Sequence, residues 1–298
     1  GFGANLFGNL GLPNTSAYLN PTKIPGLRDI RYVSCGSRHT ACVDNSGSVW
    51  TFGMNNYGQL GHGDRINRKE PTKIEHISGI LSAACGAYHS IFLNGSGTAF
   101  SCGRNSYGQL MLGTSARVLK ATEVSPLPVP VAYAACGADH SIFLLENDDV
   151  YGAGCNSKGQ LGNLPQTCKT PTKIPDLCDI IRLSCGYNQT MCINENEQLV
   201  ILGTGERQQH RFGYYYEKDQ KAKQVEGMGE RIYAISYGGF HTIFKGVSGR
   251  TWVCGRNDAG QLGLGPGAKE YIPKPMLLSE ELMAALWEKQ TTAKSARK

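Results

Sequence analysis

A nine-residue motif that recurs about every fifty residues constrains the fold of this chain more than any other feature. In its fullest form, over residues 53–61, it reads Gly-Met-Asn-Asn-Tyr-Gly-Gln-Leu-Gly. Full or partial copies begin at Gly3, Gly53, Gly103, Gly154, Gly203 and Gly255, which gives steps of 50, 50, 51, 49 and 52 residues. A spacing this regular is typical of an array of one supersecondary unit whose copies pack on their neighbours.

The glycine content agrees with an array of short strands. Glycine supplies 38 of the 298 residues, nearly twice the average share of about 7%. The glycines follow neither a collagen period nor a low-complexity tract, but fall at the repeat positions. Glycine at fixed points between β-branched segments indicates tight turns between many strands.

One unit of the repeat, over residues 30–74, predicts four strands. Segments 30–34, 39–43 and 48–53 are rich in alternating or β-branched residues, and turn residues separate them. The motif follows as a long loop, and residues 71–74 form a short fourth strand. Because this strand begins with proline, we expect it at the sheet edge. Four antiparallel strands per unit, repeated around an axis, predict an all-β chain folded as a β-propeller.

The blade count follows from the units that the chain completes. Five full units run from about residue 30 to 278, and residues 1–24 supply only the last part of another. We therefore expect one domain over 1–278, a propeller of six blades of which one is incomplete. Residues 279–298 form a second segment, predicted as a short C-terminal helix with a basic tail. This helix could pack on the propeller or dock on a partner.

Charge and cysteine usage limit the class of protein. The net charge of +6 tolerates an acidic partner but does not require nucleic acid, and no apolar run is long enough to span a membrane. Among the 11 cysteines, four take the same place in successive repeats: Cys35, Cys85, Cys136 and Cys185. This recurrence predicts small buried thiols and not disulfides or zinc ligands, which favours a reducing compartment. We expect a cytoplasmic protein, with the nucleus as the alternative.

No catalytic constellation accompanies the repeats. The sequence lacks a phosphate-binding loop, a nucleophile elbow and a His-Glu-x-x-His helix. The recurrent histidines, His39, His89, His140 and His241, are spread around the ring and are predicted to fix turns. We expect no catalytic residue, no metal and no cofactor. The only activity left open is one that needs no acid–base chemistry.

Two alternating elements, the Gly-x-Asn-x-x-Gly-Gln-Leu-Gly loop and the Cys-Gly-x-x-His turn, resemble the repeats of the regulator of chromosome condensation family. The resemblance covers nearly the whole chain up to about residue 278. It implies a β-propeller, of which known members usually have seven blades. The founding member expels guanine nucleotide from the GTPase Ran and also binds nucleosomes. The resemblance therefore implies a protein partner, with guanine-nucleotide exchange as an alternative function.

The resemblance also implies which residues contact a partner. In the founding member, residues next to the turn histidine contact the GTPase, and of the matching residues here only Asp139 has the expected type. The inserted wedge of the exchange factor has no clear counterpart. An insert over 205–229, rich in Arg and Tyr, adds two candidates. The predicted partner-binding residues are Arg38, Tyr88, Asp139, Asn188, Phe240, Arg211 and Tyr215.

Three hypotheses about function follow. The first is a non-catalytic interaction module that presents one rim of the propeller to a protein partner, with a small GTPase as candidate. The second is a guanine-nucleotide exchange factor for a Ran-like or other small GTPase. The third is a scaffold bound to chromatin or the cytoskeleton, for which the basic tail would assist.

Overall fold

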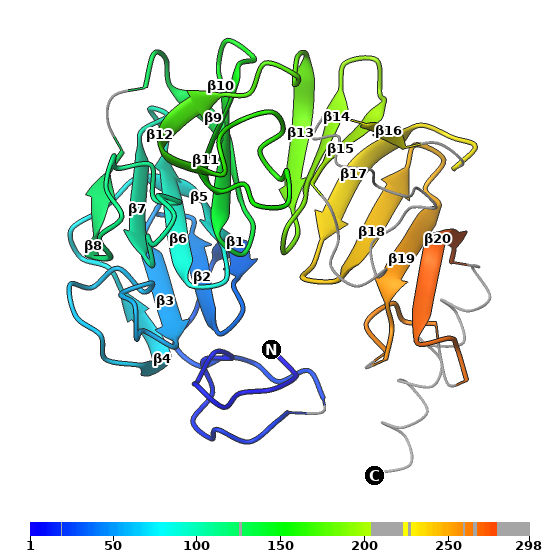
Figure 1. The fold of residues 1–298 in the computed structure, drawn as a ribbon. Coiled ribbons are helices and arrows are strands. Elements are labelled where there is room, and N and C mark those ends of the chain that lie inside the picture. The colour runs from blue at the N-terminus through cyan, green and yellow to red at the C-terminus, as the bar shows by residue number, and fades with distance from the viewer. Residues whose placement is uncertain are drawn as a thin grey trace.

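The computed structural model describes residues 1–18, 20–124, 127–203, 223–225 (backbone only), 228–258, 260–264 and 267–278. In these ranges the chain is all-β, without a helix, and forms five antiparallel sheets of four strands each (Figure 1). The described part accordingly has no helix long and apolar enough to cross a membrane. The predicted helix over 279–298 lies outside the described residues.

Within each sheet the strands are hydrogen-bonded in chain order. The first sheet holds β1 (Ile30–Cys35), β2 (His39–Asp44), β3 (Val49–Gly53) and β4 (Arg68–Lys73). The second holds β5 (Ile80–Cys85), β6 (His89–Asn94), β7 (Ala99–Gly103) and β8 (Val118–Glu123). The third holds β9 (Val131–Cys136), β10 (His140–Leu145), β11 (Val150–Cys155) and β12 (Thr167–Lys173).

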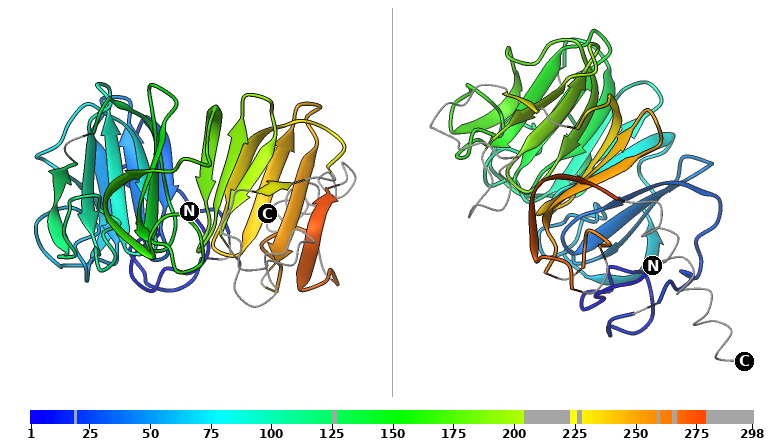
Figure 2. Two further views of the ribbon diagram at one scale, coloured as in Figure 1. Left: turned by 45° about the horizontal axis from the view of Figure 1, so that its top comes forward. Right: turned by 90° about the vertical axis from the view of Figure 1, so that its right-hand side faces the viewer.

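The last two sheets follow the same plan. The fourth holds β13 (Ile180–Cys185), β14 (Thr190–Asn194), β15 (Leu199–Leu202) and β16 (Lys223–Val225). The fifth holds β17 (Ile232–Tyr237), β18 (His241–Gly246), β19 (Thr251–Arg256) and β20 (Tyr271–Leu277). Figure 2 shows the sheets succeeding one another side by side, so each is one blade of a propeller. The predicted all-β propeller of four-stranded antiparallel blades is confirmed.

Turn chemistry fixes the hairpins, as the first blade illustrates. Between β2 and β3 the Asp44 carboxylate accepts hydrogen bonds from the backbone N–H of Ser46 (2.9 Å) and Ser48 (3.0 Å). Gly47 completes this turn with a φ of 78°, a conformation that favours glycine. The hairpin predicted from Asp44-Asn45-Ser46-Gly47 is therefore confirmed.

The motif loop is held by its asparagine. Asn55 is buried, its Oδ1 accepts from the backbone N–H of Leu60 (2.9 Å), and its Nδ2 donates to the carbonyl of Asp64 (3.1 Å). The equivalent bonds to Asn105, Asn156 and Asn257 are 2.9, 2.7 and 3.1 Å long. One amide thus ties together both ends of the loop between β3 and β4. The asparagines of the later motif loops hold their loops in the same way.

The hydrophobic core lies between neighbouring blades. Ile91 of β6 shares one buried cluster with Ala134 and Ala135 of β9, and Ala41 of β2 shares another with Ala83 of β5. Burial between sheets explains why a single blade of this size needs its neighbours, because each sheet has two apolar faces to cover.

Residues 1–24 pack on the first blade as a motif loop without its own sheet. The Thr40 hydroxyl donates to the Asn9 carbonyl (2.7 Å), just as the Ser90 hydroxyl donates to the Gln59 carbonyl (2.7 Å) one blade later. Val33 of β1 is 55% exposed whereas its equivalent Ala83 of β5 is 4% exposed, so the first blade is less covered than the second at this position. The described residues therefore form five blades, and the predicted sixth, incomplete blade has no sheet among them.

Candidate functional site

Both repeated elements lie on one face of the propeller. Because β2 and β3 are antiparallel and His39 pairs with Gly53, the Cys-Gly turn before β2 and the motif loop after β3 meet at the same end of the blade. The same pairing joins His89 to Gly103 and His140 to Gly154. We call this end of the five blades the turn face.

The turn histidines link successive blades. His39 Nε2 lies 2.9 Å from Ser90 Oγ, His89 Nε2 lies 2.9 Å from Ser141 Oγ, and His140 Nε2 lies 3.1 Å from Thr190 Oγ1. Each of these hydroxyls donates its own hydrogen to a motif-loop carbonyl, so it accepts a hydrogen from the Nε2–H of the imidazole. The expected structural role of these histidines is confirmed.

Burial keeps these imidazoles neutral. Desolvation lowers the pKa of His39 to about 4 and the pKa values of His89 and His140 to about 3. An imidazole so far from titrating at neutral pH is a poor general acid or base. The histidines consequently hold the turn face in shape and do not offer chemistry to a substrate.

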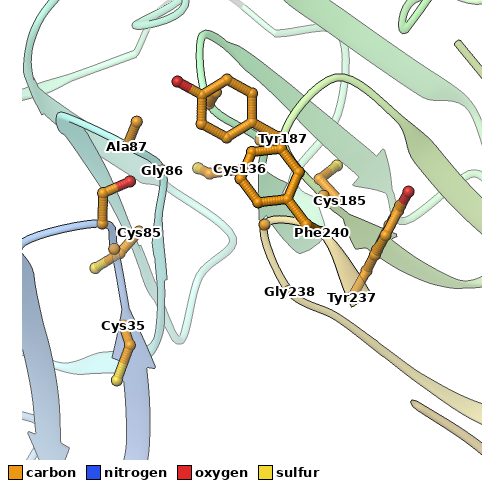
Figure 3. Close-up of a pocket in the computed structure, with 16 residues that line it drawn as sticks. Cys35, Cys85, Gly86, Ala87, Cys136, Cys185, Tyr187, Tyr237, Gly238 and Phe240 are labelled. Atoms are coloured by element: carbon orange, nitrogen blue, oxygen red, sulfur yellow. The ribbon is translucent and has the colours of Figure 1, made fainter. Parts of the chain in front are cut away.

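Four Cys-Gly turns and the equivalent Tyr237-Gly238 turn of the fifth blade line a cavity of about 320 Å³ on the turn face, here called the axial cavity. Its walls come from residues 35–37, 85–87, 136–138, 185–187 and 237–240 (Figure 3). Backbone bonds from Ala87 N to Ala138 O (3.3 Å) and from Ala138 N to Tyr187 O (3.0 Å) join three of the turns. The cavity therefore has a continuous wall built from successive blades.

The axial cavity is lined by no charged side chain, and its walls combine thiols, alanines and aromatic rings with polar backbone and hydroxyl groups. All 11 cysteines are free, and burial raises the pKa of the Cys85 and Cys185 thiols to about 12, so both remain protonated. The expectation of buried thiols holds for these two, whereas Cys35 is exposed. The described residues contain no group of three or more His, Cys, Asp or Glu placed to hold a metal ion.

Two aromatic rings mark one side of the cavity. Tyr187, from the turn after β13, and Phe240, from the turn after β17, stack with ring centroids 5.3 Å apart and planes 17° apart. Figure 3 shows both rings beside the cavity. Arg256 of the fifth motif loop places its guanidinium 5.7 Å from the centroid of Phe240, which adds a cation–π contact to the stack.

The structure places five of the predicted partner-binding residues on the turn face, one in each blade. Arg38 is exposed, and the other four are half-buried: Tyr88, Asp139, Asn188 and Phe240. Their role in binding stays a prediction. Arg211 and Tyr215 lie outside the described residues.

Asp139 is held in place by the preceding blade. Its Oδ1 lies 3.4 Å from Arg104 Nη1 and accepts a 3.1 Å hydrogen bond from Gln109 Nε2. Burial raises the pKa of the Asp139 carboxyl, and the Arg104 charge opposes that shift. Asp139 is thus an oriented carboxylate and not a freely solvated turn residue.

Sequence reasoning missed the motif-loop residues that reach across to the next turn. Tyr57 lies 5.2 Å from Tyr88 between ring centroids, and the Arg104 guanidinium lies 5.8 Å from Tyr57 and 5.9 Å from Tyr107. Arg38 is likewise stacked 4.8 Å from Phe7. Arg104 occupies the second position of the motif, and Tyr57 and Tyr107 occupy the fifth. These two positions vary while the others repeat, and this variation was the sequence signal that could have identified them.

Comparison with known families agrees with this geometry. The family model described as "Regulator of chromosome condensation (RCC1) repeat" matches residues 1–43, 46–93, 96–144, 147–193 and 248–284. These ranges together cover most of the chain. The matches over 46–93, 96–144 and 147–193 each begin near the third strand of one blade and end in the second strand of the next, which is the junction that the histidines bridge.

Individual relatives are more distant. The chain is 32% identical over 166 residues to the ultraviolet-B receptor UVR8 of Arabidopsis thaliana, covering 53% of this chain and 37% of the receptor. It is 29% identical over 139 residues to the probable E3 ubiquitin-protein ligase HERC6 of Homo sapiens, covering 45% of this chain and 14% of the ligase. The matches thus span well under half the length of either relative.

A solved structure extends the likeness of fold. Prp20p from Saccharomyces cerevisiae, whose structure is described together with its binding properties to Gsp1p and histones, superimposes with a TM-score of 0.78 at 20% identity. The superposition covers 94% of this chain and 73% of Prp20p. At this identity the match shows the propeller fold alone.

Proposed function

Since the chain belongs to the regulator of chromosome condensation repeat family, we propose that it is a protein-interaction propeller that binds a protein partner through its turn face. A small GTPase is the first candidate, because the founding member of the family acts on one and the related yeast Prp20p is described with Gsp1p. Fold alone does not transfer a partner, so the proposal depends on the residues of the face.

The observation that carries this proposal is the mixture of aromatic and Arg side chains on the turn face. Three arginines there lie over aromatic rings: Arg38 over Phe7, Arg104 over Tyr57 and Tyr107, and Arg256 over Phe240. Tyr and Arg are enriched among the residues that dominate binding energy at protein interfaces. Stacking also orders these long side chains beforehand, which reduces the entropy lost on binding.

The test is direct binding to a panel of purified small GTPases, each in nucleotide-free, GDP and GTP-analogue forms, by biolayer interferometry. We expect one GTPase to bind the full chain and the variant Arg38→Ala/Tyr88→Ala/Phe240→Ala to weaken its Kd about tenfold or more. A matched triple on the opposite face, Arg28→Ala/Leu81→Ala/Tyr233→Ala, should leave the Kd unchanged. Equal loss in both triples would contradict the proposal.

Nucleotide exchange is the second candidate, and the oriented carboxylate of Asp139 favours it. An exchange factor works by displacing nucleotide and needs no general acid or base of its own. Release of a fluorescent GDP analogue should then accelerate in the presence of this chain and slow again with Asp139→Ala. Acceleration that Asp139→Ala leaves intact would remove Asp139 from the mechanism.

Binding to chromatin or the cytoskeleton is a weaker third candidate, supported by the net charge of +6 and by the mention of histones for Prp20p. Affinity for nucleosomes should then fall steeply with salt. We further propose a cytoplasmic location, which the 11 free cysteines support. Imaging of a fluorescent fusion would test this location against a nuclear one.

A further inference from the structure

The axial cavity is shaped to receive a side chain from outside. Its lining consists of thiols, glycine backbone, Ala87, Ala138 and the rings of Tyr187, Tyr237 and Phe240, with Ser37 as the only side-chain alcohol apart from the tyrosines. No lining residue carries a charge at neutral pH, since burial raises the thiol pKa values. The thiols, Ala87, Ala138 and the aromatic rings form the apolar part of this wall, against which an apolar group can be buried.

The cavity also has the size of an interface pocket. At about 320 Å³ it exceeds the space that one Leu, Met or Phe side chain needs, and the stacked pair Tyr187–Phe240 offers a flat apolar wall. Hot spots at protein interfaces are apolar or aromatic anchors seated in such central pockets, surrounded by a polar rim.

A cationic residue directly follows a cavity-lining residue in the chain. Ser37 lines the cavity, and the next residue, Arg38, is exposed and stacked on Phe7. Arg104 and Arg256 are each engaged by a carboxylate, Asp139 and Asp258 respectively. In the part of the chain that the structure describes, Arg38 has no carboxylate partner within 4.0 Å, so its guanidinium edge is open to an anion from elsewhere.

We propose that the partner of the turn face binds through a segment in which an apolar residue stands next to an acidic one. The apolar side chain fills the axial cavity, and the neighbouring carboxylate pairs with Arg38. The commitment to an acidic protein segment comes from charge complementarity with Arg38, which no carboxylate of the described residues pairs, and from the uncharged lining. This inference rests on the proposed function and deepens it by naming the chemistry of the partner.

The test selects peptides from a random dodecapeptide display library on the immobilised full chain. Enriched sequences should share Leu, Ile, Met or Phe adjacent to Asp or Glu. Gly239→Trp is the blocking variant: Gly239 lines the cavity and a Cβ there meets nothing within 4 Å, so an indole can be added at the cavity wall without a backbone clash. Gly95→Trp is the control, because Gly95 lies in the hairpin at the opposite end of its blade and its Cβ would meet only Leu81 at 3.8 Å.

A synthetic peptide of the enriched sequence should bind Gly239→Trp about tenfold or more weakly than the wild type and Gly95→Trp normally. Arg38→Ala should lower the affinity for that peptide. It should not lower the affinity for the same peptide with its acidic residue replaced by the corresponding amide. This double-mutant cycle identifies the pair of Arg38 and the peptide carboxylate. No enrichment, or enriched peptides without the apolar–acidic pair, would overturn the inference.

The outcomes also separate this inference from the proposed function. Peptides that bind Gly239→Trp normally, yet lose affinity for Arg38→Ala/Tyr88→Ala/Phe240→Ala, would overturn the cavity anchor and leave the turn face as the binding surface. Peptides that bind both variants as tightly as the wild type would overturn both.

Discussion

His89 of the second blade lies 2.9 Å from Ser141 of the third, 52 residues further along the chain. The hydroxyl of Ser141 donates a hydrogen bond to the carbonyl of Gln109, which belongs to the motif loop of the second blade. One turn residue, one strand residue and one loop residue thereby join two blades. The recurrence of the histidine every fifty residues is explained by this junction and not by catalysis.

Removing the imidazole should destabilise the propeller. We expect His89→Ala to lower the free energy of unfolding by about 2–4 kcal/mol, because it opens a cavity and leaves the Ser141 hydroxyl without a donor. Urea denaturation followed by circular dichroism measures the change. His76→Ala is the control, since His76 is less buried and has a single 3.2 Å contact to the Ala121 carbonyl. Equal losses in both variants would argue against the junction.

Stability should fall as the pH is lowered below about 6.5. Burial lowers the folded-state pKa of His39 to about 4 and of His89 and His140 to about 3, from an ordinary value of 6.5. Above pH 6.5 both folded and unfolded states are neutral at these sites, so stability is full. Between pH 6.5 and 4 only the unfolded chain takes up protons, which costs about 2 kcal/mol per histidine at pH 5.

The fourth blade suggests the matched variant for this pH dependence. It carries Gln189 where the earlier blades carry histidine, and Gln189 is buried there. His89→Gln removes one titrating group while keeping a polar side chain of similar reach. The slope of the free energy of unfolding against pH between 6 and 4.5 should decrease by about the contribution of one histidine. An unchanged slope would mean that His89 does not titrate in the unfolded state alone.

Gly86 should tolerate no side chain. A Cβ at Gly86 would lie 2.1 Å from Cε1 of His89 and 2.5 Å from the carbonyl oxygen of Gly137, so the imidazole packs directly on the glycine. We expect Gly86→Ala to cost about 3 kcal/mol or to prevent folding. Gly95→Ala, where the nearest atom is 3.8 Å away, should stay close to the wild type in the same urea titration. A stable Gly86→Ala would contradict the observed packing.

Asp139 should titrate at a higher pH once its cation is removed. Arg104 lowers the pKa of this carboxyl against the opposing effect of burial. In Arg104→Ala the pKa of Asp139 should therefore rise, which carbon-detected NMR of the labelled carboxyl would measure. Arg28→Ala, at the opposite end of the first blade, serves as the control and should leave it unchanged. A lowered pKa in Arg104→Ala would show that another cation dominates.

The strand order, the hairpins and the asparagine-tied loops could be predicted from the sequence, because they depend on residues close together in the chain. The side-chain bonds of Asp44 and Asn55 involve partners at most nine residues away. The contact of Arg104 with Tyr57 could not be predicted in this way, since it depends on how far one blade rotates relative to the next. The exposure of Val33 could not be predicted either, because Val33 and Ala83 take the same place in the repeat although they are 55% and 4% exposed.

Candidate residues next to the turn histidines were placed correctly because their position in the repeat fixes the end of the blade at which they lie. Their environments were not predictable: Asp139 appears as a turn carboxylate in the sequence, yet Arg104 and Gln109 of the previous blade hold it. The axial cavity likewise requires five turns to converge, and the recurrence of Cys-Gly alone does not give its volume.

The central claim is that partners bind the turn face. Hydrogen–deuterium exchange of the full chain, with and without the tightest-binding GTPase or selected peptide, tests it most directly. The account predicts slower exchange in the turns 35–38, 85–88, 136–139, 185–188 and 237–240, and unchanged exchange in the hairpins at the opposite end, such as 44–48 and 94–98. Protection confined to those hairpins, with unaltered turns, would contradict it.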